Sequence, residues 1–353
     1  MKNKLLKIMM YYLILSTTNI LADTGFMLTP YASLRLQAES VSVDQAIAGQ
    51  DTSYKGLRDA YSRIGIKASS VLQNGTLLSA TIEFPVNFAE LKVEDPSFFE
   101  GFYKDNDDPR LYNISITNDE FGSLQLGKQW LTYYNHIAYP VDYFSSFYSG
   151  FATHATFRRE ALTYTTPVFS GLAVSISGVD LTDGSGTDYL DTMQYAASYN
   201  KNALSVALAY QDTVGNRANL IGLSASYTAK PWRFATKVEQ LRSNNTVTMN
   251  KDPVIFNVYG SYTKDKFTFK AMYANGDGSA GNNDEADAFF IGDSYQFGID
   301  YQYNDELLIF TEYFYEGNGY AIYTPNSKSF SPLAGYQVNT DGQAVVIGAR
   351  YDF

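Results

Sequence analysis

The chain has 353 residues, no cysteine and a formal net charge of −11, and aromatic residues make up 16% of it. The absence of cysteine excludes a disulfide scaffold and thiolate metal sites. The acidity argues against a nucleic-acid partner, because phosphate binding needs a basic surface.

The first 22 residues have the organisation of a secretory signal. Lys2, Lys4 and Lys7 precede an apolar run over residues 8–15, and a small residue, Ala22, ends the segment. A membrane anchor is the alternative, but the run is short and is followed by polar residues at 16–19. We therefore expect a signal peptide at 1–22 and one domain at 23–353, which holds no apolar run long enough for a spanning helix.

Many segments of this domain alternate between apolar and polar residues with a period of two. In 294–304, tyrosine, phenylalanine and isoleucine take the odd positions, and 204–211 and 220–228 follow the same scheme. A secreted β-sandwich would also alternate. Three features favour a membrane barrel instead: segments of about 8–12 residues, a polar face that suits a wet lumen, and connections that alternate between tight and long.

The sequence thus predicts an all-β fold, a 16-stranded antiparallel transmembrane barrel with short periplasmic turns and long extracellular loops. An even number of strands allows antiparallel closure, and sixteen leave room for an aqueous channel. The predicted strands are 28–39, 62–70, 77–85, 111–118, 123–132, 159–166, 171–179, 192–200, 203–212, 219–229, 232–241, 254–263, 266–275, 294–304, 306–316 and 343–353.

The last predicted strand runs to the final residue. Positions 345, 347, 349, 351 and 353 form its apolar face, and positions 344, 346, 348, 350 and 352 form the face toward the lumen. We expect it to pair with the first strand near 31–39, which closes the barrel without a free edge. Phe353 would then lie in the periplasmic aromatic girdle.

Five stretches resemble strands of the Gram-negative general porins. They are YASLRLQAE, SRIGIKASSVLQNGTLLSATIEF, FGSLQLGKQW, REALTYTTPVFSGLAVSISG and the terminal ARYDF. The resemblance implies an outer-membrane homotrimer for passive diffusion of small hydrophilic solutes. It also implies contact with lipid and lipopolysaccharide, and assembly by the barrel assembly machinery with Phe353 as the signal. No cofactor is implied.

The resemblance also implies a pore constriction, with a basic cluster on the wall and a third loop folded inward against it. Matched by motif, the wall candidates are Arg35, Arg63, Lys67, Lys128 and Arg159. Strand parity supports all of them except Lys128, which shares a face with apolar residues and could lie at a trimer contact. Solvated rim charge or contact with lipopolysaccharide phosphate is the alternative role for these bases.

The candidate constriction loop, residues 133–158, departs from the family pattern. Asp142 is its only acid, where the family usually has two or more, and aromatic residues predominate. The constriction candidates are Asp142, Tyr143, Phe147 and Tyr148. The aromatic rings could guide oligosaccharides, which would make this a substrate-selective porin, or they could pack the loop against the wall.

Acid excess falls mainly in other long connections, such as 277–287. These acids could hold Ca²⁺, but the spacing matches no EF-hand, so we expect no metal site and at most a weak cation preference. An enzyme is not expected, because the sequence has no Gly-x-Ser-x-Gly and only two histidines, His136 and His154. A non-conducting structural or adhesin barrel would typically have fewer strands.

Overall fold

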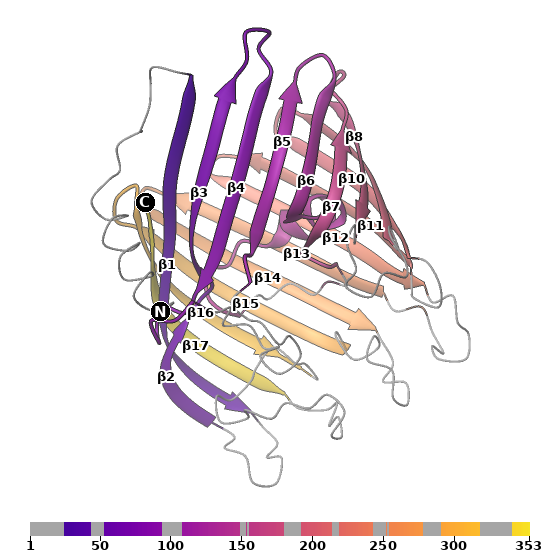
Figure 1. The fold of residues 1–353 in the computed structure, drawn as a ribbon. Helices are drawn as coiled ribbons and strands as arrows, with labels where there is room; N and C mark the ends of the chain where they lie inside the picture. Colours follow the sequence, from indigo (N-terminus) through magenta and orange to yellow (C-terminus); the bar gives the residue numbers. More distant parts are fainter. Residues whose placement is uncertain are drawn as a thin grey trace, which may run out of the picture.

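Antiparallel strands form a single closed barrel, and the described residues include two short helices inside it (Figure 1). This computed structural model describes residues 25–43, 53–93, 108–148, 153, 155–179, 192–213, 219–242, 252, 254–277, 291–317 and 341–353. No helix among these residues is long and apolar enough to cross a membrane. The predicted signal peptide at 1–22 lies outside the described residues, as do most of the acidic residues at 277–287.

Seventeen strand segments among the described residues build the wall, and from β3 to β17 each segment pairs with the next one in the sequence. They are β1 (Phe26–Val43), β2 (Ser53–Asp59), β3 (Ser62–Val71), β4 (Leu77–Val86), β5 (Leu111–Asn118), β6 (Gly122–Trp130), β7 (Arg158–Thr165), β8 (Leu172–Val179), β9 (Thr192–Lys201), β10 (Leu204–Thr213), β11 (Asn219–Ala229), β12 (Trp232–Arg242), β13 (Val254–Lys264), β14 (Phe267–Asp277), β15 (Ile291–Gln302), β16 (Leu307–Glu316) and β17 (Gly342–Asp352).

Because β2 and β3 are two halves of one wall strand, the barrel has the sixteen strands that the sequence predicts. Both halves pair with the same neighbour: β1 pairs with β3 over Phe26–Ser33 and with β2 over Leu36–Ser42. The break lies at Ala60 and Tyr61, where Tyr61 has a φ of 65°. Asp59 stabilises it by accepting hydrogen bonds from the backbone N–H groups of Ser62 and Phe88, at 2.8 and 2.9 Å.

Apolar and polar residues alternate along the strands, and the two sets of side chains point to the outer and inner faces of the wall. Val345, Ile347 and Tyr351 of β17 are 55%, 60% and 43% exposed, whereas Ala344 and Val346, at alternate positions, are buried. On β12, apolar Phe234 and Val238 are exposed, while charged Lys237 and Glu239 are buried inside. The apolar outer face matches what a lipid-facing barrel needs.

The barrel closes where β17 pairs with β1, in a register that runs from Ser33 opposite Asp352 to Val43 opposite Gly342. Beyond that ladder, the N–H of Phe353 donates to the carbonyl of Ala32 at 3.0 Å, and the reverse bond measures 2.8 Å. The Phe353 ring packs against the cluster of Ala32, Ile64 and Val86. The predicted closure of the last strand on the first is therefore confirmed, and Phe353 belongs to the seam.

Candidate functional site: the inward loop and the facing wall

The described residues of the connection between β6 and β7 (131–148, 153 and 155–157) run through the interior of the barrel, and we call them the inward loop. It contains a π-helical turn η2 (Tyr134–Ala138) and a 3₁₀ turn η3 (Tyr139–Val141), which lie inside the ring of strands (Figure 1). Both turns contact β11 and β12. Tyr133, Ile137 and Val141 recur at every fourth residue and have no exposed surface, so this side of the loop faces the wall. Tyr139, on the other side, is 52% exposed.

The wall is shaped to receive the loop at β9–β11. Gly222 lies under it, because a Cβ there would come within 2.5 Å of the Tyr133 hydroxyl and 2.8 Å of Ile137. The Ser224 hydroxyl donates to the His136 carbonyl at 2.5 Å, and Gln194 accepts from the Tyr133 backbone N–H at 2.9 Å. Burial lowers the pKa of His136, whose Nδ1–H donates to the Thr132 carbonyl at 2.8 Å.

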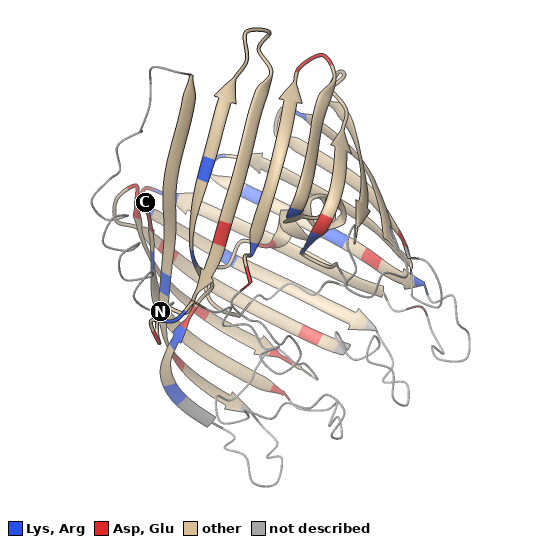
Figure 2. Cartoon of the chain, viewed as in Figure 1, with Lys and Arg blue, Asp and Glu red and all other residues tan. Residues whose placement is uncertain are grey.

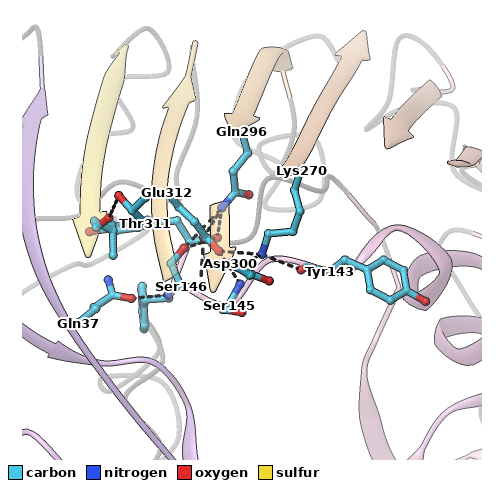
Figure 3. Close-up of polar contacts among 12 residues, drawn as sticks. Gln37, Tyr143, Ser145, Ser146, Lys270, Gln296, Asp300, Thr311 and Glu312 are labelled. Carbon is cyan, nitrogen blue, oxygen red and sulfur yellow. Dashed lines mark hydrogen bonds and ion pairs between the residues drawn. The ribbon is translucent and has the colours of Figure 1, made fainter. Parts of the chain in front are cut away.

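One carboxylate, Glu312 of β16, anchors the middle of the loop (Figure 3). It accepts hydrogen bonds from the backbone N–H groups of Ser145 and Ser146, at 2.7 and 3.2 Å. It also accepts from Lys270 at 3.2 Å and from the side-chain amide of Gln296 at 3.0 Å. The Glu312 side chain is fully buried, so these four donors replace its water, and they hold the loop against β14–β16.

Two of the three aromatic residues predicted at the constriction, Phe147 and Tyr148, are buried in packing. Phe147 stacks on Tyr61 with ring centroids 5.0 Å apart, and its backbone N–H donates to Gln37 at 2.8 Å. Tyr148 stacks on Phe314 at 5.6 Å. With 2% and 1% of their surfaces exposed, these two rings fix the tip of the loop to β1 and β16.

Asp142 and Tyr143 are half-buried. Asp142 accepts a hydrogen bond from the Tyr134 hydroxyl at 2.7 Å, and burial, with the nearby Asp142 charge, raises the pKa of Tyr134. The Tyr143 ring lies 4.1 Å from the Arg233 guanidinium, which also donates to its hydroxyl. The single acid of the loop is thus bonded within the loop.

A basic cluster occupies the wall near the seam, on β1, β3, β17 and the residue before β5. Arg35 lies within electrostatic range of Arg63, Arg110 and Arg350, and of one acid, Asp352. Arg35 and Arg350 are direct partners across the seam. Figure 2 shows basic and acidic positions close together on the wall formed by β1, β3 and β4. We call Arg35, Arg63, Arg110 and Arg350 the arginine cluster.

Glu83 of β4 neutralises part of this cluster. Its carboxylate accepts from Arg110 Nε at 3.0 Å and from the Tyr31 hydroxyl at 2.9 Å, and it lies 3.8 Å from Arg63. Arg350 pairs with Asp352 at 2.7 Å. The cluster therefore brings four guanidinium groups together with two carboxylates and keeps an excess of positive charge.

The other three wall candidates lie outside the arginine cluster. Lys67 is exposed, and its ammonium lies 5.0 Å from the Tyr31 ring. Arg159 is also exposed and pairs in register with Gln129. Lys128 is the cross-strand partner of Tyr112 on β5 and of Glu160 on β7, so the three residues form one row on the same face of the sheet. Tyr112 lines a concavity on the apolar outer surface. Lys128 thus faces outward, as its parity in the sequence suggested.

Sequence reasoning missed two parts of this site. Arg110 precedes its strand and is 27 residues from its partner Glu83, so no local pattern connects them. Glu312 is 167 residues from Ser145, and only the folded loop brings these groups together. No group of three or more potential metal ligands gathers anywhere in the described part of the chain.

Comparison with known proteins gives a consistent result. Residues 13–318 match the family described as "Gram-negative porin". Similar solved structures include the anion-selective porin from Comamonas acidovorans (TM-score 0.67, 16% identity, 93% of this chain and 100% of that one). Salmonella typhi OmpF (0.65, 18%, 94% and 99%) and OmpT of Vibrio cholerae (0.60, 16%, 95% and 100%) are also similar. A search of curated proteins found no match.

Proposed function

We propose an ion selectivity for this protein, and the proposal starts from its family. The chain belongs to the Gram-negative porin family. It resides in the outer membrane, where its 16-stranded barrel forms a water-filled channel for passive diffusion of small hydrophilic solutes and ions. What remains to be inferred is the set of solutes that the channel favours, and residues 133–158 and the wall that faces them are the segments we assign to its constriction.

We propose that the channel prefers anions over cations. The observation that supports this preference is the excess of positive charge in the arginine cluster. Charge at the narrowest part of a pore acts on a permeating ion at short range, where salt screens it poorly. The exposed bases Lys67 and Arg159 add to the excess of guanidinium groups, while Asp142 is engaged by Tyr134. The acidic connections suggested at most a weak cation preference, but we give the wall charges more weight because they lie in the lumen.

Replacing Arg35 and Arg63 together by glutamine tests this selectivity. We expect the zero-current potential in a KCl gradient to move toward the value of an unselective or cation-preferring pore, because two fixed positive charges are removed. Planar-bilayer recordings measure it. The matched control is Lys230→Gln, which removes an exposed charge from the turn between β11 and β12. A double variant that keeps the wild-type potential would rule the cluster out as the selectivity element.

Two other functions are less well supported. An oligosaccharide-selective constriction is not favoured, because Phe147 and Tyr148, two of the rings predicted to line it, are buried in the packing of the loop tip. The family and the fold are those of channels, and we propose that the protein has no enzymatic activity. His136, one of its two histidines, is half-buried and hydrogen-bonded to the backbone.

We also propose that the protein is a homotrimer, as a trimer form is described for OmpT of Vibrio cholerae. Its outer surface over β3–β6 has an apolar concavity of about 470 Å³, whose lining includes Ile66, Ile114 and Leu126. Beside it, the Tyr112 hydroxyl donates to Glu160 in the row of Lys128. Charged groups on a lipid-facing wall are costly, so another copy of the chain is a better cover than lipid.

Substituting Ile114 by arginine tests this interface. Ile114 is 59% exposed in the single chain, so an arginine there does not enter the interior of the barrel, but its charge in the concavity opposes close contact between copies. We expect monomers by native mass measurement in mild detergent, where wild type runs as a trimer. The control is Val258→Arg on β13, 50% exposed on the outer surface away from the concavity. A trimer that survives Ile114→Arg but not Val258→Arg would place the interface elsewhere.

The remaining expectations stay proposals supported by the family. They are a signal peptide at 1–22, contacts with lipopolysaccharide, and assembly by the outer-membrane barrel machinery through Phe353.

A further inference from the structure

The inward loop and the last residue of β6 carry a row of aromatic rings, and packing of the loop against the wall accounts for only part of it. We propose that this row binds aromatic carboxylates, so that the channel passes them in preference to other organic anions of similar size. The inference deepens the proposed anion preference and rests on it. It is carried by the exposure of the rings and by the positive charges at both ends of the row.

The rings form a continuous row along the loop. Tyr134 lies 4.7 Å from Trp130, 4.9 Å from Phe157 and 6.3 Å from Tyr139, measured between ring centroids. Tyr139 in turn lies 6.1 Å from Tyr143. We call these five residues the aromatic row.

The row differs from the rings that fasten the loop tip because part of it is open. Tyr139 and Phe157 are 52% and 38% exposed, whereas Phe147 and Tyr148 at the tip are almost fully buried. The contacts that these two open rings make with Tyr134 and Tyr143 are tilted, at 47–54°, so the rings are not covered by a parallel neighbour. Open ring faces in a water-filled channel can accept the face or edge of a planar solute.

Both ends of the row carry a guanidinium group. Arg158 lies 4.8 Å from the Trp130 ring, and Arg233 lies 4.1 Å from the Tyr143 ring. Two acids lie nearby, and both accept hydrogen bonds from tyrosine hydroxyls: Asp142 from Tyr134, and Glu160 of β7 from Tyr112. The two guanidinium groups lie over the ring faces themselves, where they favour a solute that carries a carboxylate.

A planar ring with one carboxylate matches both features at once. Its ring can stack on Tyr139 or Phe157 while its carboxylate is attracted to Arg158 or Arg233 and to the basic wall. A neutral sugar would use the rings but gain nothing from the charges, and a small inorganic anion would use only the charges. The aromatic carboxylate is thus the class of solute that this combination fits best.

The test compares benzoate with cyclohexanecarboxylate, which has the same charge and a similar size but no aromatic face. Permeabilities relative to chloride come from zero-current potentials across planar bilayers, for wild type and for the double variant Tyr139→Leu with Phe157→Leu. We expect wild type to favour benzoate by about two- to tenfold, the range of an aromatic pair, and the variant to bring the ratio close to one. The control, Tyr195→Leu with Tyr199→Leu, changes two exposed rings of the outer face of β9 and leaves the ratio as in wild type.

Several results would overturn the proposal. One is equal permeability of the wild-type channel to benzoate and cyclohexanecarboxylate. Another is a preference for benzoate that survives in the double variant. Block of the KCl current by maltodextrins, without discrimination between the acids, would assign the row to sugars. If the double variant fails to fold, Tyr139→Leu alone, at an exposed position, gives the same comparison. The ratio compares two monovalent anions, so it is separate from the preference of anions over cations that tests the proposed function.

Discussion

Replacing Glu312 by alanine is expected to loosen the inward loop and to destabilise the barrel together. Glu312 holds the backbone of Ser145 and Ser146 and also compensates Lys270. Removing one partner of a buried ion pair typically costs about 3–5 kcal/mol, because the other charge is left uncompensated. Asp300, 2.8 Å from Lys270, is still present in the variant and reduces that cost.

Two measurements test the effect of Glu312→Ala. The free energy of unfolding in detergent and urea should fall by a few kcal/mol. Single-channel recordings of the variant should show a current that fluctuates between levels, because the loop has lost its central anchor. The wild-type protein should give a steady current. Glu306→Ala is the matched control, because Glu306 is an exposed acid on the turn before β16. Wild-type stability and a steady current in the Glu312 variant would show that the loop does not depend on this carboxylate.

Deleting Phe353 is expected to reduce the amount of assembled barrel severalfold while leaving the current of each assembled channel nearly unchanged. The deletion removes the two backbone hydrogen bonds to Ala32 and the ring contact with Ile64. Two hydrogen bonds contribute about 1–3 kcal/mol, and a loss of 1–2 kcal/mol can change cellular abundance severalfold. The residue lies at the seam and not at the loop, so the pore should keep its conductance.

The measurement is the fraction of folded barrel in outer-membrane preparations, judged by its heat-dependent mobility. Phe353→Tyr keeps a terminal ring and both backbone bonds, so it should assemble like wild type. Phe353→Leu keeps the backbone bonds and loses the ring, which separates the role of the seam from recognition of the aromatic residue. Normal assembly of the deletion variant with an altered conductance would contradict this assignment of Phe353.

The sequence was sufficient for most of the wall because a barrel in lipid imposes strict alternation. Each strand must present one face to hydrocarbon and the other to water, and the pattern at 343–353 therefore predicted which residues are exposed. The strand at 53–59 was missed. It contains Lys55, Gly56, Arg58 and Asp59, which hide the alternation, and the break at Tyr61 interrupts its continuation into β3.

The site was only partly predictable because it depends on contacts between distant segments. Parity placed Arg35 and Arg63 on the lumen side, and both belong to the arginine cluster. Arg110 was not found, since its position depends on Glu83 across a long connection. The course of the inward loop depends on Gly222 and Glu312, which look ordinary in the sequence and become important only once the loop lies against them.

The zero-current potential of the wild-type protein in a planar bilayer, under a KCl gradient, tests the central claim most directly. A water-filled pore whose lumen carries the arginine cluster should conduct, and the sign of the potential should be that of a channel in which chloride is more permeant than potassium. A potential of the opposite sign would contradict the assignment of selectivity to this cluster, and the absence of any current would contradict the channel itself.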